Sequence, residues 1–313
     1  MAINWYLAEL WKITSKTTVK HLSAKALDNM LFAVPPLDEQ RRIAGRVSEL
    51  IPLVEEYGKL EDGREALDAA LPERLHKSVL QMAVEGKLAP QDPSDEPASV
   101  LLERIRAERA KLIKERRIKT PKGGESVIYL GSDGRRYEKR GKGEPVCIDD
   151  EIPFDIPKGW EWARFESVLY NRDAERIPVS VAEREKLEKR YDYYGASGVI
   201  DKVDKYLFDK PLLLIGEDGA NLLARTKPIA FMARGQYWVN NHAHVLDGLS
   251  EVLLEYIALF INSISLAPYV TGTAQPKMNQ AKMNSILIPL PPEEEQARIL
   301  KRAAELKVLV TNQ

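Results

Sequence analysis

Apolar side chains recur every three or four residues from residue 43 onward, and this spacing predicts a long helix. Ile43, Val47, Leu50 and Val54 follow one another at intervals of four, three and four residues, which is the a/d rhythm of a coiled-coil seam. A similar rhythm begins again near the end of the chain, at Ile299 and Leu306. The two apolar faces are therefore candidates for pairing with each other.

Two features predict an interruption of the first helix. Gly58 and Gly63 weaken a helix because glycine is a poor helix former. Pro72 predicts either a break or the first turn of a new helix, since proline lacks the N–H group that an interior position donates. Residues 37–120 are accordingly predicted to be a helical region with a weak point near residue 60.

The segment that follows is rich in basic residues. A helix is predicted over residues 98–119, and residues 101–142 contain 14 Lys plus Arg against 6 Asp plus Glu. Several glycines in residues 121–150, including Gly123, Gly124 and Gly141, indicate a flexible linker. Two interpretations of the charge remain open: a solvated helix face with a linker, or a non-specific contact with phosphate groups.

From residue 151 the pattern changes to short apolar runs separated by turns. Strands are predicted at residues 160–162, 212–216, 229–232 and 237–239, and a helix at residues 252–261. Residues 151–292 therefore form a predicted α+β domain. The overall fold class is α+β, with one such domain attached to long helical regions.

Composition narrows the class of protein. The 313 residues are 44% hydrophobic and 30% charged, with a net charge of −1, and no apolar stretch approaches the length of about 18 residues that spans a membrane. A single cysteine, Cys147, excludes an internal disulfide and a thiolate zinc cluster. Residues 1–10 lack the order of a signal peptide. These features predict a cytoplasmic protein without a membrane-bound part.

No catalytic, metal-binding or cofactor-binding motif is apparent. The chain has neither the G-x-x-x-x-G-K-[ST] phosphate loop nor the Asn-Pro-Pro-aromatic motif of amino-methyltransferases. His242 and His244 are spaced as two ligands on one strand face, but a structural or DNA-contacting role is favoured. Cys147 lies among glycines and charges, which indicates a surface position. The chain is therefore predicted to be no enzyme and to carry no cofactor.

The acidic residues leave two windows that favour contact with phosphate. Residues 219–246 and 256–292 contain no Asp or Glu, and local absence of anions is typical of a nucleic-acid face. Amide, hydroxyl and cationic groups in and beside these windows are suited to phosphates and base edges. The predicted DNA-binding residues are Ser197, Lys205, Asn221, Arg225, Arg234, Asn240, Asn241, His242, Thr273, Gln275 and Lys277.

An internal repeat joins the two ends of the chain. Residues 35–50 recur as residues 291–306, with identity at Pro35, Pro36, Glu39, Gln40, Arg42, Ile43, Arg46, Glu49 and Leu50. Residues 5–8 match residues 255–258 less closely. We therefore expect residues 1–36 to be the tail of a first recognition domain that is otherwise missing, and residues 293–313 to start a second helical region.

Together these motifs resemble the specificity subunit of type I restriction-modification enzymes. The shared features are Pro-Pro-x-x-Glu-Gln-x-x-Ile at residues 35–43 and 291–299, the stretches 71–88 and 95–102, and Ile-Pro-Lys-Gly-Trp-Glu-Trp at residues 156–162. The resemblance implies two target-recognition domains separated by two antiparallel helical regions. Each domain would bind half of a split site in double-stranded DNA, with methylation and restriction subunits as partners.

Alternatives to this interpretation differ in what the chain binds. It could be a non-enzymatic coiled-coil assembly protein whose α/β domain binds protein, or a methyltransferase fragment with an unrecognised site. The seam of Ile43, Val47, Leu50 and Val54 also predicts a homodimer about a twofold axis, with a split palindromic target. Residues 299–310 or a partner subunit are the other candidates to cover that seam.

Overall fold

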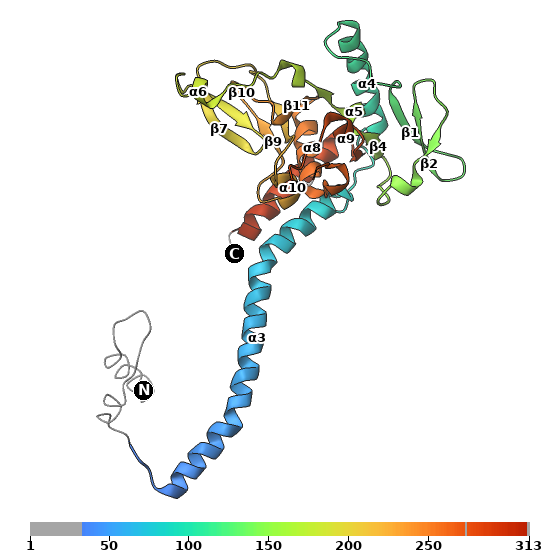
Figure 1. Cartoon of the computed structure of the whole chain (residues 1–313). Coiled ribbons are helices and arrows are strands. Elements are labelled where there is room, and N and C mark those ends of the chain that lie inside the picture. The colour runs from blue at the N-terminus through green and yellow to red at the C-terminus, as the bar shows by residue number, and fades with distance from the viewer. Residues whose placement is uncertain (1–32, 273, 312–313) are drawn as a thin grey trace. The chain divides into compact units, whose positions relative to one another are not determined.

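The computed structural model describes residues 33–272 and 274–311. Predictions for residues 1–32, including the match at residues 5–8, lie outside the described residues. The chain forms two compact units, residues 1–69 and 70–313, and each is described by itself. Figure 1 labels the main helices and strands. No helix in the described ranges is long and apolar enough to cross a membrane.

The first unit contributes most of α3, which extends from Leu37 to Val84 over 48 residues. The predicted weak point near residue 60 is wrong, because the helix continues through Gly58, Gly63 and Pro72. A glycine costs only about 1 kcal/mol in a helix interior, and a proline removes a single hydrogen bond of the ladder. The remaining residues of α3 therefore keep it helical.

The basic helix α4 spans Ala98–Lys114 and ends earlier than predicted. Arg116 adopts a left-handed φ of 58°, a conformation that cannot continue a right-handed helix. Inside α4, Arg109 is buried and its Nη1 donates to the Leu169 carbonyl at 2.9 Å. One cation of this helix thus serves the fold.

Residues 121–150 are an ordered sheet, so the predicted flexible linker is wrong. β1 (Ser126–Leu130), β2 (Arg136–Arg140) and β3 (Val146–Cys147) pair in antiparallel order. The glycines shape turns here. Gly134 and Gly141 have φ of 77° and 50°, which glycine adopts without strain, and Gly131 N donates to Arg135 O at 2.7 Å to close the hairpin.

The region after residue 150 contains three sheets, and the predicted α+β class is confirmed. The strands are β4 (Glu161–Arg164), β5 (Tyr170–Asn171), β6 (Tyr191–Gly195), β7 (Gly198–Val203), β8 (Leu212–Gly216), β9 (Ala230–Ala233), β10 (Tyr237–Val239), β11 (Ala243–Asp247) and β12 (Leu287–Leu290). β5, β11, β8 and β9 form one sheet in that order, β10, β6 and β7 form a second, and β12 pairs with β4.

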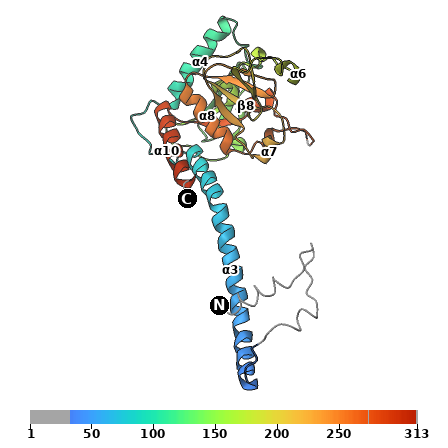
Figure 2. The ribbon, with the colours of Figure 1, turned by 90° about the vertical axis from the view of Figure 1, so that its left-hand side faces the viewer.

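Helix α8 (Glu251–Ser263) lies at the centre of the core, against β8 and β9, and Figure 2 shows it beside β8. Its capping residue Ser250 accepts from Leu253 N, and its Tyr256 is fully buried. Helix α10 (Glu293–Thr311) packs against α8. Shorter helices complete the region: η1 (Asp149–Glu151), α5 (Phe165–Val168), η2 (Asp173–Glu175), α6 (Val181–Arg184), α7 (Asn221–Ala224), η3 (Ala267–Tyr269) and α9 (Gln280–Asn284).

Candidate nucleic-acid interface

Three loops meet where β8 ends and β11 begins. Glu217 N donates to His242 O at 2.9 Å, and Glu217 O accepts from Met278 N at 2.9 Å. Gly219 N donates to Pro276 O at 3.0 Å. These backbone bonds join residues 217–220, 240–242 and 274–278 into one surface, which we call the loop face.

Four of the predicted DNA-binding residues are exposed on the loop face: Asn241, His242, Gln275 and Lys277. Asn240 lies behind them, buried, and its Oδ1 accepts from His242 N at 2.8 Å. The turn that carries Ser197 is also close, since a Cβ added at Gly216 would lie 2.7 Å from Ala196 O. The structure therefore brings together residues that are up to 80 positions apart in the printed sequence.

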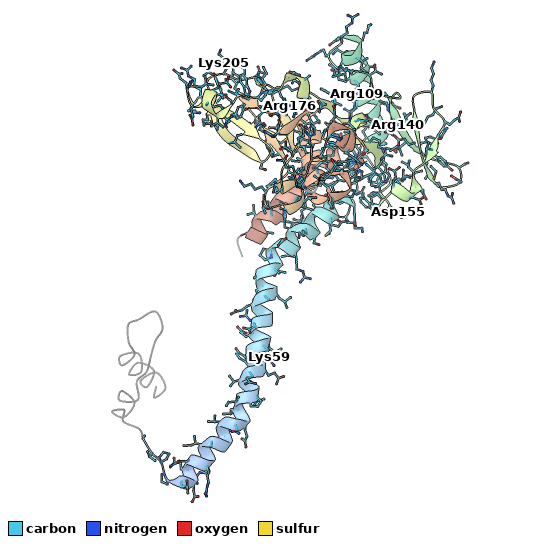
Figure 3. All side chains as sticks on the ribbon, viewed as in Figure 1. Lys59, Arg109, Arg140, Asp155, Arg176 and Lys205 are labelled. Atoms are coloured by element: carbon cyan, nitrogen blue, oxygen red, sulfur yellow. The ribbon has the colours of Figure 1, made fainter. Side chains whose placement is uncertain are left out.

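A network of ion pairs lies beneath the loop face. Glu217 accepts from Arg176 Nη1 at 2.9 Å and pairs with Lys277 Nζ at 3.0 Å. Arg176, labelled in Figure 3, also donates to Ala243 O at 2.6 Å. Because Glu217 is half-buried, its charge is compensated by both cations, and this fixes the position of Lys277 on the surface.

His244 extends the network into the sheet. Its Nδ1 lies 2.6 Å from Asp173 Oδ2 and its Nε2 lies 2.9 Å from Met278 O. Both ring nitrogens face oxygen acceptors, and this geometry favours the doubly protonated ring. Burial alone lowers the pKa of His244, but Asp173 outweighs it and raises that pKa above its usual value.

The carboxylates respond in the opposite direction. Burial raises the pKa of Asp173 and of Glu217, but the cations and hydrogen bonds around them prevail and lower both pKa values. Asp173, Glu217 and His244 have the spacing of a metal site. However, Arg176 and Lys277 already supply positive charge there, which favours a structural ion network over a metal site.

His242 does not share this environment, although it is only two residues from His244. It precedes β11, is exposed, and places Nδ1 2.8 Å from Asp218 Oδ2. The two histidines thus have separate partners and do not form the pair of ligands on one strand face that their spacing would allow. His242 remains a candidate for contact with a bound molecule.

Several other predicted DNA-binding residues hold the fold together. Arg225 has a left-handed φ of 56°, and its guanidinium donates to Ile261 O at 2.9 Å and to Ile264 O. Burial lowers its pKa. The side chain of Asn221 accepts from Lys227 N at 3.0 Å and closes a turn. These geometries favour structural roles for Arg225 and Asn221.

The remaining candidates lie away from the loop face or outside the described residues. Arg234 follows β9 at the end of the sheet where β8 starts, because Ala233 pairs with Leu212, and it forms an ion pair with Glu251 at 2.6 Å. Lys205 follows β7, whose start carries the turn of Ser197, so a six-residue strand separates them. Thr273 lies outside the described residues.

The acid-free windows predict a more positive surface than the loop face has in the structure. Glu217 and Asp218 lie just before the first window in the sequence, and Asp173 lies in a distant segment. Glu217 pairs with Lys277, Asp218 with His242, and Asp173 with His244. Arg176 and Glu217, which organise the loop face, carry no local signal, since their partnership depends on a β-sheet register that connects residues far apart.

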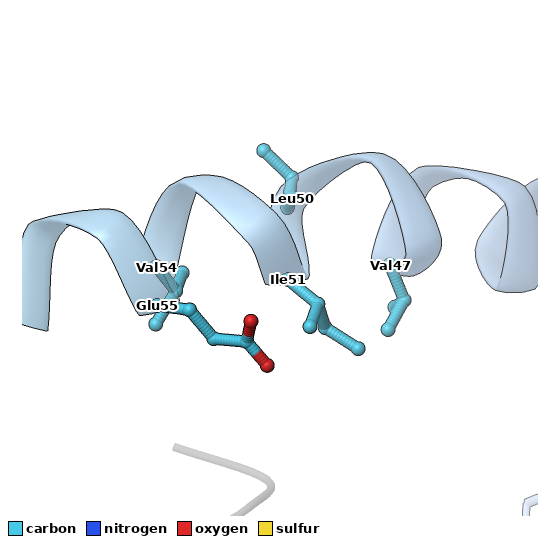
Figure 4. Close-up of a pocket in the computed structure, with 5 residues that line it drawn as sticks. All are labelled: Val47, Leu50, Ile51, Val54 and Glu55. Atoms are coloured by element: carbon cyan, nitrogen blue, oxygen red, sulfur yellow. The ribbon is translucent and has the colours of Figure 1, made fainter.

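The helix α3 presents the second predicted site. Its seam residues are exposed, by 49% for Ile43, 48% for Val47, 40% for Leu50 and 67% for Val54. Figure 4 shows a shallow apolar pocket here, lined by Val47, Leu50, Ile51, Val54 and Glu55. In the other unit, Ile299 is fully buried in the core and Leu306 is half-buried.

Comparison with known proteins finds a family match for the part of the chain that carries the loop face, and relatives that match more of the chain. Residues 157–306, which include the loop face, match the family described as the type I restriction modification DNA specificity domain. Residues 157–306 thus belong to the family of type I DNA specificity domains, and the chain is similar to type I specificity subunits. It is 26% identical to the Type I restriction enzyme EcoAI specificity subunit of Escherichia coli, covering 94% of this chain and 56% of that protein.

Two further specificity subunits are similar to this chain, one in sequence and one in structure. The Type I restriction enzyme EcoEI specificity subunit of Escherichia coli is 29% identical over 72% of this chain and 39% of that protein. The HsdS subunit from Thermoanaerobacter tengcongensis matches with a TM-score of 0.44 and 16% identity, over 97% of this chain and 61% of the other. The chain thus spans about half the length of the two curated specificity subunits from Escherichia coli.

Proposed function

We propose that this chain is a DNA sequence-specificity subunit of a type I restriction-modification complex. The observation that carries the proposal is the match of residues 157–306 to a DNA specificity domain, because the loop face lies within these residues. Its exposed amide, imidazole and ammonium groups are suited to base edges and phosphates. Such a subunit would act in the cytoplasm and bind one half of a bipartite target in double-stranded DNA.

The chain contributes recognition and no chemistry in this proposal. Methylation and restriction subunits would be its partners and would supply the catalytic sites. We therefore expect the purified chain alone to transfer no labelled methyl group from S-adenosylmethionine to DNA. Methyl transfer by the isolated chain would contradict the proposal and support the alternative of a methyltransferase fragment.

Purification of the native complex, followed by mapping of the DNA positions that it methylates, tests the proposal. A bipartite motif shared by the methylated sites is the expected result. The variant Asn241→Ala/His242→Ala/Gln275→Ala should relax or abolish one half of that motif, since these residues lie on the loop face. Lys158→Ala, at an exposed lysine outside the loop face, is the control and should leave the motif unchanged.

An unchanged motif in the loop-face variant would place recognition elsewhere in the chain. A complex that methylates no shared motif would favour the assembly-protein alternative, in which the α/β domain binds protein. Each variant should unfold at the same temperature as the unmodified chain, because the replaced side chains are exposed. This measurement separates a loss of recognition from a loss of folding.

The exposed seam on α3 is consistent with assembly through this helix. Ile43, Val47, Leu50 and Val54 are apolar and uncovered in the described residues, and burial of such a stripe is favourable by about 25 cal/mol per Å². A homodimer is one occupant, and it would join two identical recognition domains on a split palindrome. Light scattering over a concentration series tests it: a monomer mass at every concentration would exclude the homodimer.

A further inference from the structure

The end of α4, the loop after it and the β1–β3 sheet carry eight exposed cations, which we call the basic wing. No ion pair links any of them to a carboxylate among residues 33–272 and 274–311. They are Lys114, Arg116, Arg117, Lys119, Lys122, Arg135, Lys139 and Lys142. All lie between residues 114 and 142, outside the loop face and in the same compact unit.

The acidic side chains of this segment do not neutralise the wing. Glu125 is taken by the buried Arg109, at 3.2 Å. Glu138 is buried and accepts from Arg164 Nη2 at 2.8 Å and from Ser126 Oγ at 2.6 Å. Of the four carboxylates in this segment, Glu138 is buried and Glu125 is half-buried, so Glu115 and Asp133 are the two that are exposed beside the eight cations.

The β1–β3 sheet gives these cations a firm support. On its inner side, Ile128 and Ile148 are buried against Trp162. On its outer side, the strand register pairs Lys139 with Val127 and Tyr129 with Tyr137, whose rings stack at 6.1 Å. A five-residue strand is about 17 Å long, which equals the rise of about five base pairs along the axis of a DNA duplex.

The arginines of residues 151–292 differ from those of the basic wing in having partners within the chain. In residues 151–292, Arg225 donates to backbone carbonyls and every other arginine forms an ion pair. Those pairs involve Arg164, Arg172, Arg176, Arg184, Arg190 and Arg234. The unpaired arginines of the wing thus have the exposure and the unused charge that contact with an external polyanion requires.

We propose that the basic wing binds the phosphate backbone of duplex DNA independently of sequence. This inference rests on the proposed function and adds a second contact of a different kind. Phosphate contacts hold a protein on the duplex, whereas contacts with base edges specify the sequence. The wing therefore supplies affinity, and the loop face supplies the choice of target.

The test uses the full chain and a labelled duplex of random sequence, titrated over a series of salt concentrations. The wing variant is Lys119→Gln/Lys139→Gln/Lys142→Gln. The control, Lys158→Gln/Lys186→Gln/Lys301→Gln, changes the net charge equally at exposed lysines outside the wing. Each phosphate contact contributes about 0.9 to the slope of log K against log salt, so the wing variant should flatten that slope by about 3 units. Equal slopes for the two variants would overturn the proposal.

A second duplex, carrying the target mapped from the native complex, separates this inference from the proposed function. The wing variant should weaken binding to the target and to random DNA by the same factor, which leaves the preference unchanged. If the chain prefers the target duplex but the wing variant leaves the salt slope unaltered, the inference about the wing alone is refuted. If the chain shows no preference for the target but the wing variant flattens the slope, the proposed function is refuted and the inference about the wing stands. Loss of a partner subunit without a change in DNA binding would make the wing a protein-docking surface and overturn the inference.

Discussion

The two copies of the Pro-Pro-x-x-Glu-Gln-x-x-Ile motif begin their helices in the same way but differ in their surroundings. Gln40 Nε2 donates to Pro35 O at 2.7 Å, and Gln296 Nε2 donates to Pro291 O at 2.9 Å. Acidic residues occupy the first turn of both α3 and α10, where the helix dipole favours them. The motif therefore encodes a helix start that does not depend on burial.

We call each copy of the motif, together with the helix start that it forms, a junction. Burial distinguishes the second junction, at residues 291–299, from the first, at residues 35–43. Glu295, Gln296 and Ile299 are each at most 1% exposed, whereas Ile43 is 49% exposed and Glu39 and Gln40 are exposed as well. Trp160 Nε1 donates to Glu295 Oε2 at 2.8 Å, and Gln91 Nε2 donates to Glu295 Oε1 at 2.6 Å. The same motif thus becomes a packing centre where neighbouring segments supply matching groups.

The largest expected effect is the loss of an apolar side chain from the buried junction. Ile299→Ala should lower the free energy of unfolding by about 2–5 kcal/mol, since it leaves a cavity in the core. The matched change Ile43→Ala should stay within about 0.5 kcal/mol, because that residue is exposed. Urea unfolding followed by tryptophan fluorescence gives both values. Similar losses at the two positions would mean that Ile43 is also covered.

A smaller effect is expected from the donor to Glu295. Trp160→Phe removes a hydrogen bond to a buried carboxylate, which should cost about 1.5–3 kcal/mol. Trp238→Phe is the control, since its Nε1 donates to Ile177 O at 2.6 Å nearer the surface and to an uncharged acceptor. It should cost less than Trp160→Phe in the same urea titration, monitored by circular dichroism. The reverse order would show that the bond to Glu295 contributes little.

The glutamine bond allows the same interaction to be compared in two environments. Gln296→Ala should cost about 1 kcal/mol because the Pro291 carbonyl loses its donor in a buried site. Water can replace Gln40 at Pro35, so Gln40→Ala should change the free energy of unfolding by less than about 0.5 kcal/mol. Equal costs would indicate that the helix start, and not its burial, determines the contribution of the bond.

The same contrast explains what the sequence could predict. Periodicity identified α8 and the strands at residues 212–216 and 237–239, because each is a local pattern of apolar residues. Glycine content gives the wrong prediction for residues 121–150, where it indicates a flexible linker. In the structure the glycines form turns between β1, β2 and β3. Turn glycines and linker glycines differ in their φ angles, which composition does not reveal.

The candidate site was predictable only in part. The chemistry of Asn241, His242, Gln275 and Lys277 predicts contact with DNA, and the structure brings these residues together. The same chemistry predicts contact for Arg225, yet Arg225 donates to carbonyls at the end of α8. Whether a cation is free depends on partners that lie far away in the chain, and counting charges within a window cannot include them.

The smallest expected effect concerns the protonation of Glu295. Burial raises the pKa of this carboxyl above its usual value, although Trp160 and Gln91 act in the opposite direction. A carboxyl with a raised pKa in the folded state stabilises the fold most below its unfolded pKa, and this contribution is lost as the pH rises through the folded pKa. The unmodified chain should therefore lose stability relative to Glu295→Gln as the pH rises from acid toward neutral.

Glu39→Gln is the matched control at the exposed junction, and its difference from the unmodified chain should not vary over the same range of pH. Urea unfolding at a series of pH values measures both differences. A flat difference for Glu295→Gln would mean that the hydrogen bonds from Trp160 and Gln91 balance the cost of burying the charge. A difference that changed in the opposite direction would mean that those bonds prevail, and that the second junction is held together by an ionised glutamate.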